Sequence, residues 1–162
     1  MSAALLYIIS ILPSDVQDFA FAIFNELTAL ITSLSARVDV PFNATNFAAT
    51  AAMTWTLTAP DQATYSYVLN GKLLTVFVQL NTTTVGGVVA GANLTIKMPL
   101  GLLAAKTFAQ TGIGAPGGAA SEGIIVSVTS GSNLITLLRY SANWVLGADN
   151  TSINFTAIIP VQ

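Results

Sequence analysis

Hydrophobic and polar positions change their period once along the chain, near residue 50. Before that point apolar residues recur every three or four positions, the spacing of one face of an α-helix. The residues that carry this spacing are Val16, Ala20, Ile23, Leu27, Leu30 and Leu34. Their alternating steps of four and three form a heptad pattern. The pattern predicts an amphipathic helix whose apolar stripe is an oligomer interface.

The predicted helix has a start signal and a stop signal. Ser14 is a candidate N-cap, and Gln17, three residues later, would complete a capping box. At the other end Pro41 disfavours a helical residue before it, so we expect the helix to end near Asp39. The segment that follows, "VPFNATNFAAT", is typical of a linker with polar turn formers.

A second apolar row runs beside the first and consists of Phe24, Ile31 and Val38. The stripe is therefore wider than a two-stranded coiled coil requires, and it favours a trimer or larger bundle. An amphipathic helix that lies on its own sheet would show the same width, so this alternative stays open.

The apolar run from Ala3 to Leu12 could be a signal peptide, a membrane span or a surface covered by other protein chains. A cleaved signal peptide would need a basic residue before the run, and none is present. A membrane span would need about 20 apolar residues, whereas this run stops at Pro13. We therefore expect an apolar arm that neighbouring protein chains cover.

From Met53 onward the pattern alternates with period two, which predicts β-strands. We expect strands at "MTWTLTA", "ATYSYVL", "KLLTVFVQL", "NLTIKM", within "LGLLAAKTFAQ", and at "IIVSV", "NLITLL" and "INFTAII". Asn70-Gly71 is a strong hairpin signal. "KLLTVFVQL" is apolar on both faces in places, which predicts a central strand covered on both sides. "TGIGAPGGAASEG" is expected to be a long glycine-rich loop.

The expected fold is mainly β. Eight strands with frequent turns predict a jelly-roll-like β-sandwich, preceded by the apolar arm and the amphipathic helix. We place the arm and the oligomerising helix at residues 1–41 and the β-sandwich domain at residues 42–162.

Composition strengthens the assembly hypothesis. Charged residues make up 7% of the chain and hydrophobic residues 53%, whereas an average domain is about 25% charged. The buried centres of protein–protein interfaces are depleted in charge. The composition therefore favours a protein that forms large protein–protein contacts over one that stays monomeric.

The absence of cysteine and histidine limits the possible chemistry. Disulfides, thiolate and imidazole metal sites, and a histidine general base are excluded. The basic residues Arg37, Lys72, Lys97, Lys106 and Arg139 are scattered and form no patch in the sequence. With a net charge of −2, we expect neither nucleic acid nor a membrane among the partners.

No motif supports catalysis or a cofactor. "GIGAPG" matches G-x-G-x-x-G through Gly112, Gly114 and Gly117, but Pro116 lies within it and no helix is expected after it. The acids of the strand region, Asp61, Glu122 and Asp149, lie far apart beside turn residues. A carboxylate pair, or a Ca²⁺ site at Asp149, has little support against solvated turn acids. We expect no enzyme, no cofactor and no metal.

Four aromatic residues, Trp55, Tyr65, Tyr67 and Trp144, are the candidates for stacking on sugars. The first three lie on the apolar positions of alternating segments. We therefore favour core packing over sugar binding for these side chains.

Between Trp55 and Gly101 the chain reads W-x-L, then Y-x-Y-x-L-N-G-K-x-L-T-V-F-V-x-L-N-T-T-T-V-G-G, then L-T-I-K-M-P-L-G. This run of strands and turns resembles the small jelly-roll modules of tailed-phage virion proteins. Such modules occur on head decoration (cement) proteins, head fibres and tail fibres, usually as trimers.

The resemblance implies a structural virion protein, with itself and the major capsid protein or another virion protein as partners. A trimeric capsid decoration protein that stabilises the shell is the leading hypothesis. A fibre or adaptor module that binds a host receptor or glycan is the alternative.

Overall fold

The computed structural model describes residues 13–34, 36–140 and 142–162. The chain divides into two compact units, Met1–Ala36 and Arg37–Gln162, which we call the helical unit and the β unit. This division precedes the boundary expected between residues 41 and 42. The difference arises because Val38 and Asp39 pair with a strand of the β unit. The apolar arm expected at residues 1–12 lies outside the described residues.

Helix α2 (Ser14–Leu34) differs from the expected helix at both ends. The Gln17 N–H donates to the Pro13 carbonyl at 2.9 Å, so Pro13, rather than Ser14, occupies the cap position. The helix ends at Leu34 instead of near Asp39, and Val38–Asp39 forms strand β1. Val38 is therefore not part of the second apolar row, which the described helix keeps at Phe24 and Ile31.

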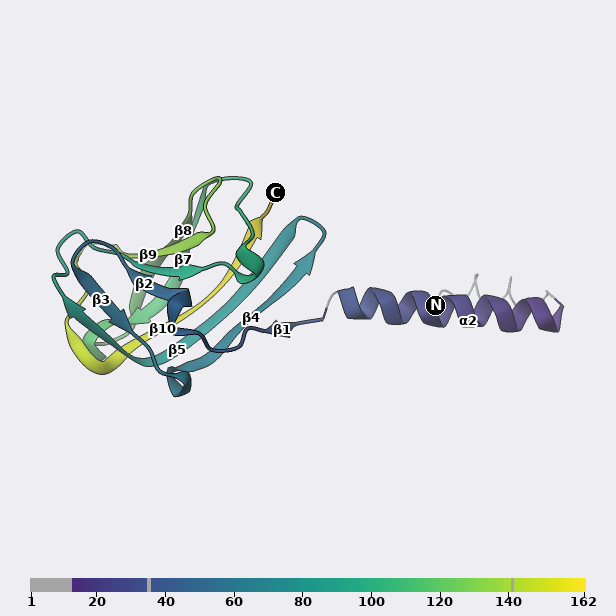
Figure 1. Ribbon diagram of the computed structural model, residues 1–162, viewed down its shortest axis with the longest axis horizontal. Helices are drawn as coiled ribbons and strands as arrows, with labels where there is room; N and C mark the ends of the chain where they lie inside the picture. The colour runs from purple at the N-terminus through teal and green to yellow at the C-terminus, as the bar shows by residue number, and fades with distance from the viewer. Residues whose placement is uncertain (1–12, 35, 141) are drawn as a thin grey trace. The chain divides into compact units, whose positions relative to one another are not determined.

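The β unit is a curled antiparallel sheet of ten strands that forms a half-barrel (Figure 1). Its strands are β1 (Val38–Asp39), β2 (Phe47–Ala49), β3 (Met53–Thr56), β4 (Gln62–Asn70), β5 (Leu73–Gly87), β6 (Leu94–Lys97), β7 (Phe108–Ala115), β8 (Glu122–Val128), β9 (Leu134–Arg139) and β10 (Gly147–Pro160). Short 3₁₀ turns are η1 (Ala44–Asn46), η2 (Ala59–Asp61), η3 (Pro99–Gly101) and η4 (Pro116–Gly118). The molecule is thus mainly β with one α-helix among its described residues.

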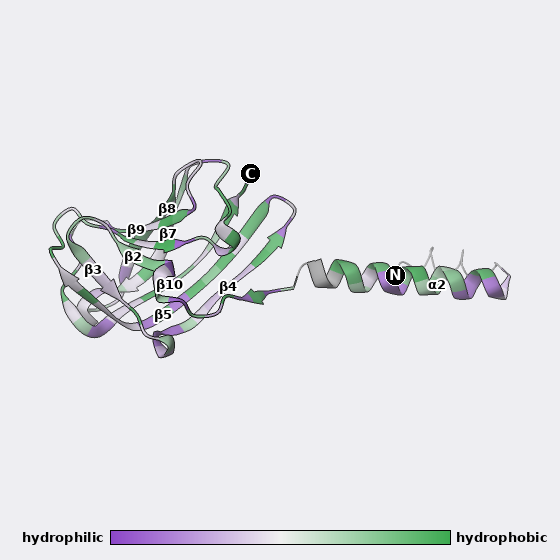
Figure 2. Ribbon diagram, viewed as in Figure 1, coloured by the Kyte–Doolittle hydropathy of each residue, from purple (hydrophilic) through white to green (hydrophobic). Residues whose placement is uncertain are grey.

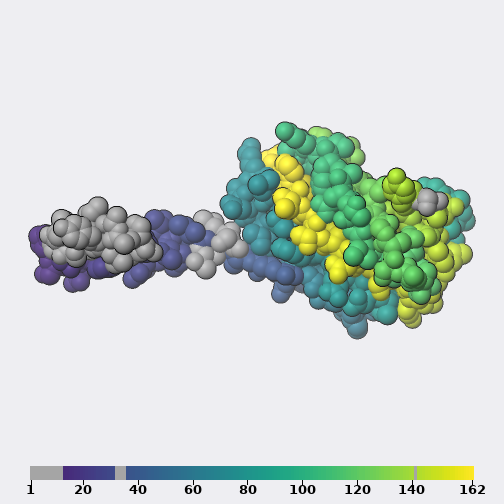
Figure 3. Space-filling view, turned by 180° about the vertical axis from the view of Figure 1, so that it is seen from behind, coloured from purple at the N-terminus to yellow at the C-terminus, as the bar shows by residue number. Residues whose placement is uncertain are grey.

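The strands follow the order β1-β4-β5-β10-β7-β8-β9-β6-β2, and β3 pairs with the far end of β5. Figure 3 shows β10 in yellow between the teal strands and the green strands, in agreement with its pairing to both β5 and β7. Only residues 50–52 separate β2 from β3. Because four residue steps span at most about 14 Å, this link draws β6 and the end of β5 together and curls the sheet.

One hydrophobic core fills the concave side of the sheet. It is built from alternate residues, such as Leu74, Val76, Val78 and Leu80 of β5, all at most 2% exposed. The predicted inward faces of "NLTIKM" and "INFTAII" are confirmed, because Leu94, Ile96, Met98, Ile153, Phe155, Ala157 and Ile159 are buried. Figure 2 shows hydrophobic and polar residues side by side along the strands of the β unit.

Strand β5 is central, as predicted, but it is not covered on both faces within the described structure. Thr75 and Phe77 on its outer face are half-buried, and Gln79 is exposed. The hairpin predicted at Asn70-Gly71 is present, with its turn displaced by one residue. Asn70 pairs with Leu73, so Gly71 and Lys72 form the turn. Gly71 alone of these two has a positive φ, +57°, as a turn with glycine first requires.

The glycine-rich segment expected to be a loop is a strand at both ends, because residues 111–115 belong to β7 and Glu122 and Gly123 to β8, and only residues 116–121 connect the two strands. The prediction was wrong for residues 111–115, because glycine was taken as a sign of a turn. At Gly112 a Cβ atom would lie 2.9 Å from the Phe155 Cβ and 2.9 Å from the Val126 Cγ2. The glycines of β7 therefore allow neighbouring side chains to approach the strand closely.

Candidate interaction surfaces

The residues predicted to form an oligomer interface lie along an apolar stripe of helix α2. Val16 is 40% exposed, Ile23 52%, Leu27 51% and Leu30 55%, while Ala20 is half-buried. Leu34 ends the helix, and its side chain lies outside the described residues. None of the described side chains of the helix is buried. The stripe thus faces solvent along the described helix, which is costly for so many large apolar groups.

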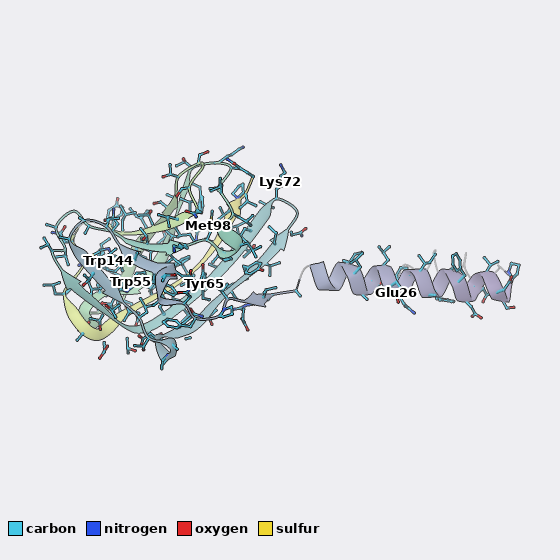
Figure 4. The ribbon with its side chains drawn as sticks, viewed as in Figure 1. Glu26, Trp55, Tyr65, Lys72, Met98 and Trp144 are labelled. Carbon is cyan, nitrogen blue, oxygen red and sulfur yellow. The ribbon has the colours of Figure 1, made fainter. Side chains whose placement is uncertain are left out.

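The charges of helix α2 and one more exposed aromatic residue add to this description. Asp15 lies in the first turn, where the helix dipole favours negative charge, and the last turn has no basic residue. Phe19 is 66% exposed and widens the stripe on the side opposite Phe24. Figure 4 labels Glu26, the last acidic residue of the helix. Among the described residues, no helix is long and apolar enough to cross a bilayer.

The three acids of the strand region each have partners of their own. Asp61 is only 8% exposed, so its interpretation as a solvated turn acid was wrong. Its carboxylate accepts hydrogen bonds from the Thr58 N–H at 2.7 Å, the Thr58 hydroxyl at 2.9 Å and the Thr82 hydroxyl at 3.2 Å. Asp61 therefore links the start of η2 to strand β5.

Asp149 and Glu122 take part in separate contacts. Asp149 accepts a hydrogen bond from the Thr84 hydroxyl at 2.9 Å. Glu122 pairs with Arg139, whose Nε and Nη2 both donate to its carboxylate. In the described part of the chain, no group of three or more acidic residues is placed to hold a metal ion.

The hydrogen bonds from Arg139 lower the pKa of Glu122, and the Glu122 carboxylate raises the pKa of Arg139. The pair therefore stabilises the fold above the ordinary carboxyl pKa, and the contribution is lost as the pH falls through the lowered value. The Glu122 side chain is 36% exposed. Solvent screening thus limits the contribution to about 1 kcal/mol at most.

The "GIGAPG" segment does not form a dinucleotide site. Gly112 and Gly114 lie within strand β7, and Gly117 lies in η4 with a φ of +61°. Strand β8 follows η4 in the chain, where a dinucleotide site needs a helix.

Trp55 and Tyr65 belong to the core, as the alternation predicted, and Trp144 belongs to it as well, while Tyr67 packs against it. Trp55, Tyr65 and Trp144 are 7%, 2% and 2% exposed, and Tyr67 is half-buried. Figure 4 labels Trp55, Tyr65 and Trp144 within the β unit. Burial raises the pKa of Tyr65, whose hydroxyl donates to the backbone carbonyl of Lys97. The Trp144 indole N–H is buried and has no partner among the described residues.

The exposed aromatic residue of the β unit is Tyr140, which the sequence analysis did not single out. It is 83% exposed and borders a surface hollow of about 370 Å³. Thr111, Glu122 and Gly123 also line this hollow. Tyr140 follows the last residue of β9, so the alternation that identified the other aromatics gives no signal at this position.

Comparisons of the chain with protein-family models, curated proteins and solved structures find no match.

Proposed function

We propose that this chain is a structural subunit that self-associates through helix α2, and that it decorates and stabilises the capsid of a tailed phage. The observation that carries the proposal is the exposed apolar stripe of the helix. Val16, Ile23 and Leu27 follow heptad spacing and stay solvent-exposed in the single chain. A second and a third copy would cover them, and the width of the stripe favours a homotrimer.

The β unit would face outward from the shell as a jelly-roll-like domain. Its ten strands and single core support a fold of this kind, and the link between β2 and β3 joins the β2 end of the strand order to the far end of β5. The partner in the virion would be the major capsid protein or another virion protein, contacted by the arm at residues 1–12. The virion assignment itself rests on the resemblance of the run from Trp55 to Gly101.

A receptor- or glycan-binding fibre or adaptor module is the second candidate. The hollow beside Tyr140 favours it, because an exposed aromatic ring next to a carboxylate is suited to stacking and hydrogen bonding with a sugar. Binding to a glycan array that Tyr140→Ala abolishes would support this candidate. No binding by the wild-type protein would remove it.

Native mass spectrometry of the full-length chain tests the self-association, with three copies as the expected result. Leu27→Asp places a charge within the stripe, and we expect the association to weaken by several kcal/mol because an unpaired charge would be buried. Asn25→Asp is the matched control, since Asn25 lies on the opposite side of the helix. A monomer at micromolar concentration, or equal effects of both variants, would refute the helical interface.

The role on the particle needs a separate experiment. Deletion of residues 1–12 should abolish incorporation into particles and leave the β unit folded. If the shortened protein occupied particles to the wild-type level, the anchoring role of the arm would be wrong. A fibre or adaptor role would then become the better hypothesis.

A further inference from the structure

Four segments of the β unit meet at one end of the sheet. They are the tip of the β4–β5 hairpin, the loop from β6 to β7, the turn from β8 to β9, and the residues after β10. Backbone hydrogen bonds join them from Val161 to the Lys72 carbonyl (2.9 Å), from Gln162 to the Leu103 carbonyl (3.0 Å) and from Ala104 to the Ser132 carbonyl (2.9 Å). The segments therefore form one continuous surface.

All three lysines of the chain lie on this surface, although they are scattered in the sequence. Lys72, Lys97 and Lys106 are exposed, and none forms an ion pair within the described structure. Residues 70–73, 97–107, 129–134 and 160–162 contain no acidic side chain. Figure 4 labels Lys72 at the tip of the hairpin. We call this surface the lysine end, and its side-chain charge is entirely positive.

Four exposed leucines lie among the lysines. Leu73 is 49% exposed, Leu100 64%, Leu103 42% and Leu134 36%. Leu134 pairs directly with Lys97 across β9 and β6, so an apolar and a cationic side chain stand side by side. Leu100 adopts a φ of +61°, a conformation that favours glycine or asparagine. Its exposure and its backbone conformation are both unfavourable in the free protein.

We propose that the lysine end binds the surface of an anionic lipid bilayer. Leucines at loop tips can enter the boundary between headgroups and acyl chains, while lysines extend along them to reach lipid phosphates. A protein partner fits less well, because protein interfaces are depleted in lysine and enriched in tyrosine, tryptophan and arginine. This contact goes beyond the proposed function and departs from the expectation of no membrane partner.

Sedimentation of the full-length protein with lipid vesicles tests the proposal. We expect binding to vesicles of three parts phosphatidylcholine and one part phosphatidylglycerol, and little binding to pure phosphatidylcholine. The binding should weaken as salt is raised from 0.05 M to 0.5 M, because salt screens the attraction between lysines and headgroups.

The combined variant Lys72→Gln, Lys97→Gln, Lys106→Gln separates this surface from the apolar stripe of helix α2. Each lysine should contribute about fivefold to the affinity, so the combined loss should be on the order of a hundredfold. The variant keeps the stripe, and adsorption through the helix would be unaffected by it.

Leu100→Asn tests the apolar contribution. Asparagine suits a positive φ, so this variant should fold at least as stably as the wild type and yet bind vesicles about tenfold more weakly. Leu146→Asn is the matched control, because Leu146 is 54% exposed and precedes β10 at the other end of that strand. It should bind as the wild type does.

Three results would overturn the proposal. They are no binding of the wild type to anionic vesicles, equal binding to neutral vesicles, and unchanged binding by the combined lysine variant. Lysine-dependent binding to duplex DNA or to polyglutamate, without binding to vesicles, would assign the lysine end to a different polyanion and would also overturn it.

Discussion

A buried hydrogen-bond chain joins strands β3, β5 and β10. The Trp55 indole N–H donates to the Thr83 hydroxyl at 2.8 Å, and that hydroxyl donates to the Thr151 carbonyl at 2.9 Å. Thr83 and Thr151 are fully buried, and Trp55 is 7% exposed. No solvent is available to replace either bond, so both groups depend on the Thr83 hydroxyl.

Thr83→Val should therefore destabilise the β unit strongly although it preserves the shape of the side chain. The substitution leaves a donor on Trp55 and an acceptor on Thr151 without their partner. A buried polar group that loses its partner costs about 1–3 kcal/mol. Two such groups lose their partner here, and the added methyl group recovers part of their combined cost. We therefore expect the free energy of unfolding to fall by about 2–4 kcal/mol.

Urea denaturation followed by tryptophan fluorescence measures this change. Both tryptophans of the chain, Trp55 and Trp144, lie in the β unit, so the signal reports on that unit alone. Thr75→Val is the matched control, because Thr75 is half-buried on the outer face of the same strand. It should change the free energy of unfolding by about 0.5 kcal/mol or less.

Equal effects of Thr83→Val and Thr75→Val would refute the reasoning. A double-mutant cycle with Trp55→Phe provides a second measurement, since phenylalanine removes the indole donor. The two substitutions should couple by at least about 0.5 kcal/mol, and strict additivity would show that the bond between Trp55 and Thr83 contributes nothing.

Two further predictions concern the core. Gly112→Ala should destabilise the β unit by about 1–3 kcal/mol in the same urea assay, because the new Cβ would lie 2.9 Å from the Phe155 Cβ. Gly123→Ala, where a Cβ meets only an ordinary contact at 3.5 Å, should be close to neutral, and a similar loss for both variants would contradict the packing argument. Because burial raises the pKa of Tyr65, the stability that its neutral phenol contributes is present below the usual phenol pKa and is lost as the pH rises beyond it. Absorbance at 295 nm should show that Tyr65 ionises only with unfolding, and ionisation of Tyr65 in the folded protein would contradict its burial.

The sequence predicts the core strands well, since their two faces differ in environment. Strand β3 and most of strand β10 bury alternate residues against the core, and period two records that difference directly. Strands β1 and β2 have only two and three residues. Such lengths are too short to establish a period, so pairing with distant strands determines them.

The two proposed interaction surfaces also differ in how far the sequence could predict them. The apolar stripe of α2 could be predicted because seven-residue spacing is a local property of the sequence. The lysine end could not, because Lys72 lies in the β4–β5 turn, whereas Lys97 ends β6 and Lys106 lies in the loop after it, and only the fold brings these segments together. Tyr140 likewise has no periodic context.

The pairing of β5 with β10 has a consequence for the order of folding. Leu73 pairs with Pro160 and Leu80 with Ile153, so the centre of the sheet joins early and late parts of the chain. Pairing across such separations requires a large loop to close and is slow. On the ribosome the β4–β5 hairpin emerges long before β10, and one edge of β5 stays unpaired until synthesis of this segment is nearly complete. During that interval the edge is open to pairing with other chains, so rapid translation or bound chaperone should raise the yield of folded protein.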